Sequence, residues 1–157
     1  MNPPNVCPEC KAVWDEGTAC QEYFHQMLFW ESENPSYGVV HHLMVLCYYL
    51  QHPSLYSPDG LDYSRQLLVD FLEHGLSTQE VRQRSRDRVS STNRKWKVTG
   101  RPGSQGEYKH PVEWKMTAKD VVSGGAENYV VNVQKWAERV FEDLRVSGNV
   151  RQEGESF

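Results

Sequence analysis

Apolar residues along this chain return mostly at the three- and four-residue intervals that are typical of amphipathic helices. The most regular stretch covers residues 127–144 and predicts the clearest amphipathic helix of the chain. Earlier stretches predict helices at about residues 20–33, 37–51, 58–74 and 77–88, and residues 117–120 resemble a helix start. The pattern therefore predicts a mainly α fold that resembles a helical bundle.

Capping residues mark the ends of two of these predicted helices. Ser57 before Pro58 has the order of an N-cap residue followed by the first helical position. Ser77 and Glu80 have the spacing of a capping box. Gly75 follows the third predicted helix and suits a left-handed C-cap. These signals place the third and fourth helices next to each other in the chain.

Two parts of the chain lack a helical period. Residues 1–20 contain prolines at positions 3, 4 and 8 and are expected to form an irregular head. Residues 89–116 are expected to form a basic loop region, with a short irregular or β-hairpin insertion around residues 96–116. We therefore expect a single helical domain over residues 1–147 and a flexible tail over residues 148–157.

The composition excludes several classes of protein. The chain has 157 residues, of which 38% are hydrophobic and 11% aromatic, which is too apolar for a disordered chain. No segment approaches the roughly 20 apolar residues that a membrane helix needs. The first residues have neither the basic nor the apolar region of a secretory signal peptide. We therefore expect a cytoplasmic protein without membrane contact, whose 4 cysteines are reduced thiols or metal ligands.

Three of the cysteines lie in the irregular head with the spacing of metal ligands. Cys7 and Cys10 form a Cys-Pro-x-Cys motif, and Cys20 stands at the start of the first predicted helix. A Cys-x-x-Cys turn places two thiolates on one zinc ion, and zinc takes four such ligands in a tetrahedron. The alternatives are a redox pair or three unrelated free cysteines. A thioredoxin-like redox motif would lie near a βαβ pattern, which this periodicity does not indicate.

The fourth ligand must come from the remaining histidines and cysteine. The candidates are His25, His41, His42, Cys47 and His52. On an ideal helix His41, Tyr48 and His52 return to one face, because they are spaced by whole numbers of turns. We therefore predict a zinc-binding head in which His41 is the fourth ligand, with His52 in reserve.

We expect one Zn²⁺ per chain, and iron is the alternative metal because thiolates suit both. Three acidic residues, Glu31, Glu33 and Asp70, are candidate hydrogen-bond partners for a buried histidine or for a metal ligand.

A basic segment occupies the middle of the chain. Residues 82–101 hold eight basic residues against one acidic residue, Asp87, whereas the whole chain has a net charge of −4. The candidate contacts to phosphate or RNA are Arg88, Arg94, Lys95, Trp96, Lys97 and Arg101. The alternative is a solvated helix end whose arginines pair with acidic residues elsewhere. Arginines alternate from position 82 to position 88, so on a helix they spread around the axis.

Several motifs together resemble a known family. They are Cys7-Pro-x-Cys10, Cys20 with Phe24, the run from His41 to Gln51-His52-Pro53, and the later run from Asn128 to Trp136-Ala137. They resemble a small bacterial family that is known only as a domain of unknown function. The resemblance spans most of the chain except its middle. It implies a metal-binding helical protein and carries over no activity and no catalytic residue.

The leading hypothesis is a zinc-binding helical protein with a structural metal, which acts as a binding or regulatory factor for a protein partner. The alternative is a metalloenzyme with an open metal position, in which Tyr48, Gln51 and His52 line a pocket. A second alternative is a zinc-responsive factor that contacts RNA or the ribosome through residues 82–101.

Overall fold

The computed structural model describes residues 5–15, 17–90 and 105–150. Its α-helices are α1 (Cys20–Glu33), α2 (His41–Leu50), α3 (Pro58–Glu73), α4 (Thr78–Ser90), α5 (Ala118–Ser123) and α6 (Tyr129–Val146). Short 3₁₀-helices are η1 (Pro35–Val40), η2 (Pro53–Leu55) and η3 (Ala126–Asn128). The described residues contain no strand, and an isolated antiparallel bridge joins Val6 and Val13. The predicted mainly α fold is confirmed.

The second predicted helix is divided in the structure. Residues 35–40 form the 3₁₀-helix η1, which begins at Pro35, and α2 begins only at His41. The amide of His41 donates to the carbonyl of Gly38, which is the spacing of a 3₁₀ turn. At the other end, α2 stops at Leu50, one residue before the predicted end at residue 51. Both differences shorten α2 to 10 residues, so its two ends lie about 15 Å apart.

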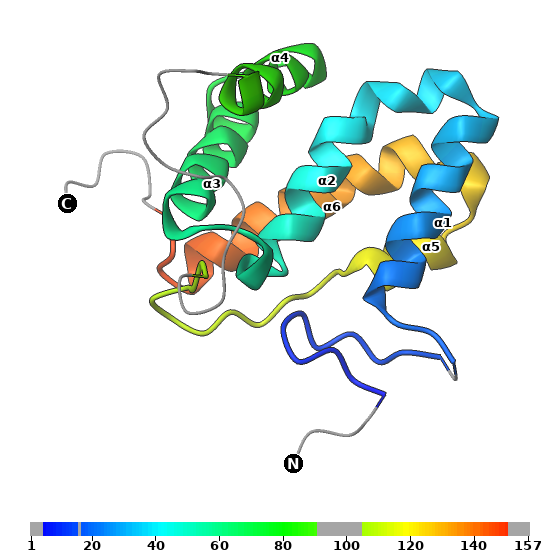
Figure 1. Cartoon of the computed structure of the whole chain (residues 1–157), viewed down its shortest axis with the longest axis horizontal. Helices are drawn as coiled ribbons and strands as arrows, with labels where there is room; N and C mark the ends of the chain where they lie inside the picture. The colour runs from blue at the N-terminus through cyan, green and yellow to red at the C-terminus, as the bar shows by residue number, and fades with distance from the viewer. Residues whose placement is uncertain (1–4, 16, 91–104, 151–157) are drawn as a thin grey trace.

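Helix α2 forms the centre of the core. It packs against α6, α4 and α3, while α1 packs against α5. Figure 1 shows α3 and α4 on one side of the molecule and α1 and α5 on the other, with α2 and α6 between them. Met44, Cys47 and Leu50 of α2 and Trp136 of α6 are fully buried. The near-continuous apolar character of α2 therefore matches a helix that is covered on most of its faces.

The segment between α4 and α5 is fastened to the C-terminal end of α2. The amide of Gly106 donates to the Tyr56 carbonyl at 2.7 Å, and the phenol of Tyr108 donates to the Leu50 carbonyl. A Cβ on residue 106 would lie 2.7 Å from the Pro53 carbonyl oxygen, so only glycine fits there. Residues 105–116 are irregular, and residues 96–104 of the predicted insertion lie outside the described residues.

The chain continues to pack against the body after α6. The side chain of Asn149 accepts from the amide of His110 at 3.1 Å and donates to its carbonyl at 2.8 Å. Residues 148–150, which we assigned to the flexible tail, therefore contact the body, and residues 151–157 lie outside the described residues. Among the helices described, none combines the length and the apolar character that crossing a membrane requires.

The N-cap of α3 gives a test of how the sequence specifies this fold. The Ser57 hydroxyl accepts a hydrogen bond from the Gly60 amide at 3.0 Å. We expect Ser57→Ala to lower the free energy of unfolding by about 1 kcal/mol, because one amide of the first turn loses its partner. Urea unfolding followed by circular dichroism measures this change. Ser32→Ala, on an exposed part of α1, is the control and should change stability by less than about 0.5 kcal/mol; equal losses would contradict the capping role.

Candidate metal centre

The Cys7–Cys10 segment forms a tight turn in the irregular head. The amide of Cys7 donates to the Ala12 carbonyl at 2.9 Å, and the amide of Lys11 donates to the Cys7 carbonyl at 3.1 Å. Inside the turn, the amide of Cys10 donates to the Cys7 sulfur at 3.4 Å. Lys11 closes the turn with a left-handed φ of 67°. The turn therefore presents two sulfurs on the same side of the backbone.

Four buried side chains from three parts of the chain converge beside this turn. They are Cys7, Cys10, Cys20 and His52, and their ligand atoms all lie within 4.8 Å of one another. The sulfurs of Cys10 and Cys20 are 3.5 Å apart, and the Cys7 sulfur lies 3.6 Å from Nε2 of His52. Ligands around a tetrahedral zinc ion are separated by about 3.8 Å between sulfurs and about 3.6 Å between sulfur and nitrogen. These four residues could therefore hold a metal ion.

The backbone fixes the orientation of His52. Its Nδ1 donates to the Tyr48 carbonyl at 2.7 Å, which leaves Nε2 to face the sulfur of Cys7. The ring of Tyr48 lies against the imidazole with 4.3 Å between the centroids. A histidine that binds a metal through one ring nitrogen usually donates a hydrogen bond from the other, because this bond fixes the tautomer and the ring orientation.

His41, our first choice for the fourth ligand, lies elsewhere. Its Nδ1 is 2.6 Å from the carboxylate of Glu31, at the opposite end of α2 from His52. The prediction placed both histidines on one face of a single helix, either end of which could reach the cysteines. The described residues of the head dock at the C-terminal end of α2, and the length of the helix keeps His41 out of the cluster. The reserve candidate, His52, takes the position that we had given to His41.

The other candidate ligands also lie outside the cluster of four. Cys47 is fully buried in the middle of α2, and burial raises the pKa of its thiol above the ordinary range. Tyr48 packs on His52 as described, and Gln51 is fully buried with its amide donating to the Met116 carbonyl at 2.6 Å. These two residues, which the metalloenzyme alternative assigned to a pocket, are packed parts of the structure around the cluster.

Two residues that the sequence analysis missed support the cluster from outside. The indole N–H of Trp14 donates to the Cys20 sulfur at 3.2 Å. The carboxylate of Glu9 accepts from the amide of Ser54 at 3.0 Å and from its hydroxyl at 2.9 Å. Glu9 is the variable residue of the Cys-Pro-x-Cys motif, and Trp14 follows Cys10 by four positions, so their closeness to the cysteines in sequence was the signal for them. Through Glu9 the head is joined to the chain just after His52.

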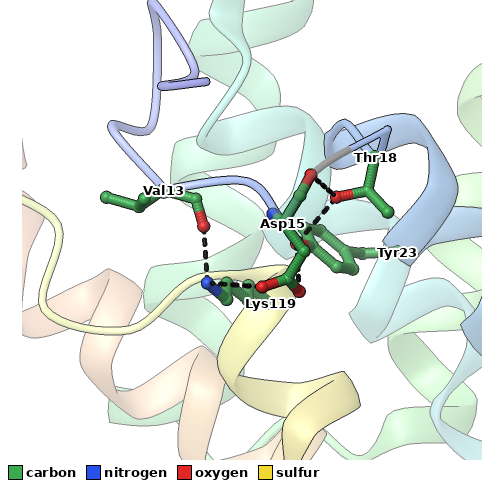
Figure 2. Close-up of polar contacts among 5 residues, drawn as sticks. All are labelled: Val13, Asp15, Thr18, Tyr23 and Lys119. Carbon is green, nitrogen blue, oxygen red and sulfur yellow. Dashed lines mark hydrogen bonds and ion pairs between the residues drawn. The ribbon is translucent and has the colours of Figure 1, made fainter. Parts of the chain in front are cut away.

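A further set of polar contacts holds the loop between Cys10 and Cys20 against α5. Figure 2 shows Lys119 reaching from α5 to the head, where its ammonium donates to the Val13 carbonyl at 2.6 Å and lies 3.6 Å from the carboxylate of Asp15. The hydroxyl of Thr18 donates to the Asp15 carbonyl at 2.6 Å, and the phenol of Tyr23 donates to its carboxylate at 3.3 Å. Protein contacts alone therefore already place the loop that carries Cys20.

The electrostatics of the cluster favour a cation at its centre. Hydrogen bonds from Cys10 and Cys20 hold the pKa of Cys7 well below its ordinary value, whereas the neighbouring sulfurs of Cys20 and Cys7 raise the pKa of Cys10 far above it. Burial lowers the pKa of His52, but hydrogen bonds to the Cys20 and Cys7 sulfurs outweigh burial and raise it to about 10. Without a cation, these sulfurs cannot all be thiolates together, because like charges repel in a buried site. A metal ion removes that conflict.

The residues predicted to contact RNA are mostly outside the described part of the chain. Arg94, Lys95, Trp96, Lys97 and Arg101 all lie within residues 91–104. The backbone of Arg88 belongs to α4, but the position of its side chain is not described. RNA contact through this segment therefore stays a prediction.

Fold and site together define a mainly helical protein with a buried Cys₃His cluster beside an irregular N-terminal head. A family model described as a family of unknown function, DUF5946, matches residues 5–145. The chain belongs to this family, and the resemblance to an uncharacterised family is confirmed. Comparisons with curated proteins and with solved structures gave no match.

The contact from Trp14 to Cys20 gives a test of the support around the cluster. We expect Trp14→Phe to weaken metal affinity by about tenfold, because the Cys20 sulfur loses a hydrogen bond while the aromatic packing remains. Competition with a chromogenic chelator measures the affinity. Trp30→Phe is the matched control, since Trp30 packs against Tyr129, whose phenol donates to Glu31 at the other end of α2. An unchanged affinity in Trp14→Phe, or an equal loss in both variants, would contradict the role assigned to Trp14.

Proposed function

We propose that this protein binds one zinc ion through Cys7, Cys10, Cys20 and His52, and that the metal is structural. The observation that carries the proposal is the convergence of these four buried side chains, whose ligand atoms all lie within 4.8 Å of one another. Three thiolates and one imidazole form one of the usual donor sets of structural zinc sites. Iron also suits a thiolate-rich tetrahedral site and is the second candidate metal.

The number and burial of the ligands support a structural role for the metal. Protein side chains supply all four positions, whereas a catalytic zinc keeps one position for water or substrate. The exposed fractions of the four residues are 3% for Cys7, 1% for Cys10, 4% for Cys20 and 5% for His52. A surface cavity of about 340 Å³ near the head includes Glu9 and Pro53 in its lining but none of the four ligands. These features favour a closed site over the metalloenzyme alternative.

The position of the cluster indicates what the metal stabilises. It joins the turn at Cys7 and Cys10, the first residue of α1 and the residue that follows α2, which are separated in sequence. The head has little apolar surface of its own to bury, so a metal that binds only the folded arrangement would stabilise it by mass action. On this proposal the protein is a cytoplasmic binding or regulatory factor for a protein partner, and RNA or the ribosome is the alternative partner.

Metal content per chain tests the assignment. We expect about one zinc ion in the native protein, lost in Cys20→Ser and His52→Ala and kept in Cys47→Ser and His41→Ala, because only the first pair removes a ligand. Elemental mass spectrometry of the purified variants measures this. His52→Cys should keep the zinc by forming a Cys₄ site, which separates a lost ligand from a failure to fold.

Each outcome of this comparison bears on either the ligand set or the identity of the metal. Zinc that is lost in His41→Ala but kept in His52→Ala would contradict the proposed ligand set. Iron in place of zinc in the native protein would keep the site and change the metal. Native protein purified without any metal, and unable to take one up, would overturn the proposal.

Removal of the metal tests its structural role. We expect an excess of chelator to lower the melting temperature by at least about 5 °C, because the free energy of metal binding is part of the free energy of folding. Differential scanning calorimetry measures the change, and Cys47→Ser should show the same sensitivity to chelator as the native protein. A melting temperature that does not respond to removal of a measured, bound metal would contradict a structural role.

A further inference from the structure

A second polar cluster lies at the other end of α2, away from the candidate metal centre. The carboxylate of Glu31 on α1 accepts hydrogen bonds from Nδ1 of His41 on α2, at 2.6 Å, and from the phenol of Tyr129 on α6. The side chain of Glu31 is only 9% exposed, and Tyr129 is fully buried. The buried carboxylate therefore fixes the His41 ring from one side and leaves Nε2 as the ring nitrogen available to a ligand. The His41 side chain is 36% exposed, so a ligand can reach it.

Helix α2 carries a second histidine beside His41, and the neighbouring helix α4 carries two arginines. The ring of His42 lies 5.0 Å from that of His41 between centroids. Helix α4 packs against both α2 and η1, and it places Arg82 and Arg86 one turn apart on the same face. Both arginines are exposed, and among the described residues neither has an ion-pair partner. Arg84 lies on another face of α4 and pairs with Asp70 at 2.6 Å.

The charges of these arginines act on His42. Burial, followed by the positive charges of His41, Arg82 and Arg86, lowers the pKa of His42 from 6.5 to about 4, while Glu31 acts in the opposite direction. The site therefore brings together several groups that are positively charged or can become so. The carboxylate of Glu31 already accepts hydrogen bonds from two donors, His41 and Tyr129. An anion would relieve that repulsion.

We propose that His41, His42, Arg82 and Arg86 bind the phosphoryl group of a small phosphorylated ligand. Two guanidinium groups one helical turn apart match phosphoryl oxygens, which guanidinium recognises through paired, charge-assisted hydrogen bonds. Nε2 of His41, held by the bond from Nδ1 to Glu31, supplies a further contact of fixed direction. The site uses none of the four proposed metal ligands, so it stands or fails independently of the zinc proposal.

Binding of inorganic pyrophosphate to the purified full chain, measured by isothermal titration calorimetry, tests this site. We expect saturable binding that becomes about tenfold weaker in Arg82→Gln and in Arg86→Gln, because each loses charge-assisted hydrogen bonds. Arg84→Gln is the matched control, since it removes the same charge from the same helix and should change the affinity by less than about twofold. Unchanged helicity and melting temperature show that the variants are folded.

A second readout follows the histidine itself. Pyrophosphate should raise the pKa of His42, measured by NMR titration, because a bound anion offsets the charges of the two arginines. By linkage, the affinity should then increase as the pH falls toward that pKa, as long as the phosphoryl group keeps its charge. An unmoved pKa of His42 at saturating pyrophosphate would overturn the site.

Three other outcomes would also overturn the proposal. The first is the absence of saturable binding. The second is an equal loss of affinity in Arg84→Gln and Arg86→Gln, which would indicate a diffuse effect of net charge. The third is a single-stranded RNA that binds far more tightly than pyrophosphate and depends on the same two arginines, which would assign the surface to nucleic acid.

Discussion

The structure depends on the attachment of an irregular head to the C-terminal end of α2. Four ligand atoms within 4.8 Å of one another provide the chemical basis of that attachment. Three sulfurs this close are unfavourable as free thiolates and favourable around a cation, so this geometry is compatible with a bound metal ion. His52 completes the set because the chain leaves the helix after Leu50 and the Tyr48 carbonyl holds the imidazole in place.

Protein contacts reinforce this attachment on both sides. Glu9 connects the cysteine turn to Ser54, and Lys119 connects the loop before α1 to α5. The Cys20 sulfur also receives a hydrogen bond from Trp14. In a site prepared in this way, binding of a metal would require little further ordering of the chain, because most of the ligands are already oriented.

The two ends of helix α2 lie beside different groups of polar side chains. Its C-terminal end faces sulfur ligands in a buried environment, and its N-terminal end carries two histidines beside arginines and a buried carboxylate. With 10 residues, the helix is too long for one histidine to serve both ends. The two ends can therefore change independently, although both rest on the same buried core residues of α2.

Local signals in the sequence determined the helical class, most helix boundaries and three of the four clustered residues. Apolar spacing, the capping residues Ser57 and Ser77, and the Cys-Pro-x-Cys turn depend on neighbours only a few positions apart. The choice between His41 and His52 depended on where α2 ends and which end meets the head, and both are set by packing between distant segments. Packing between distant segments also decides the pairing of Glu31 with His41. It decides as well which of the alternating arginines of α4 face α2. A helical period gives the angle between side chains, but it does not give the side of the helix that meets a neighbour.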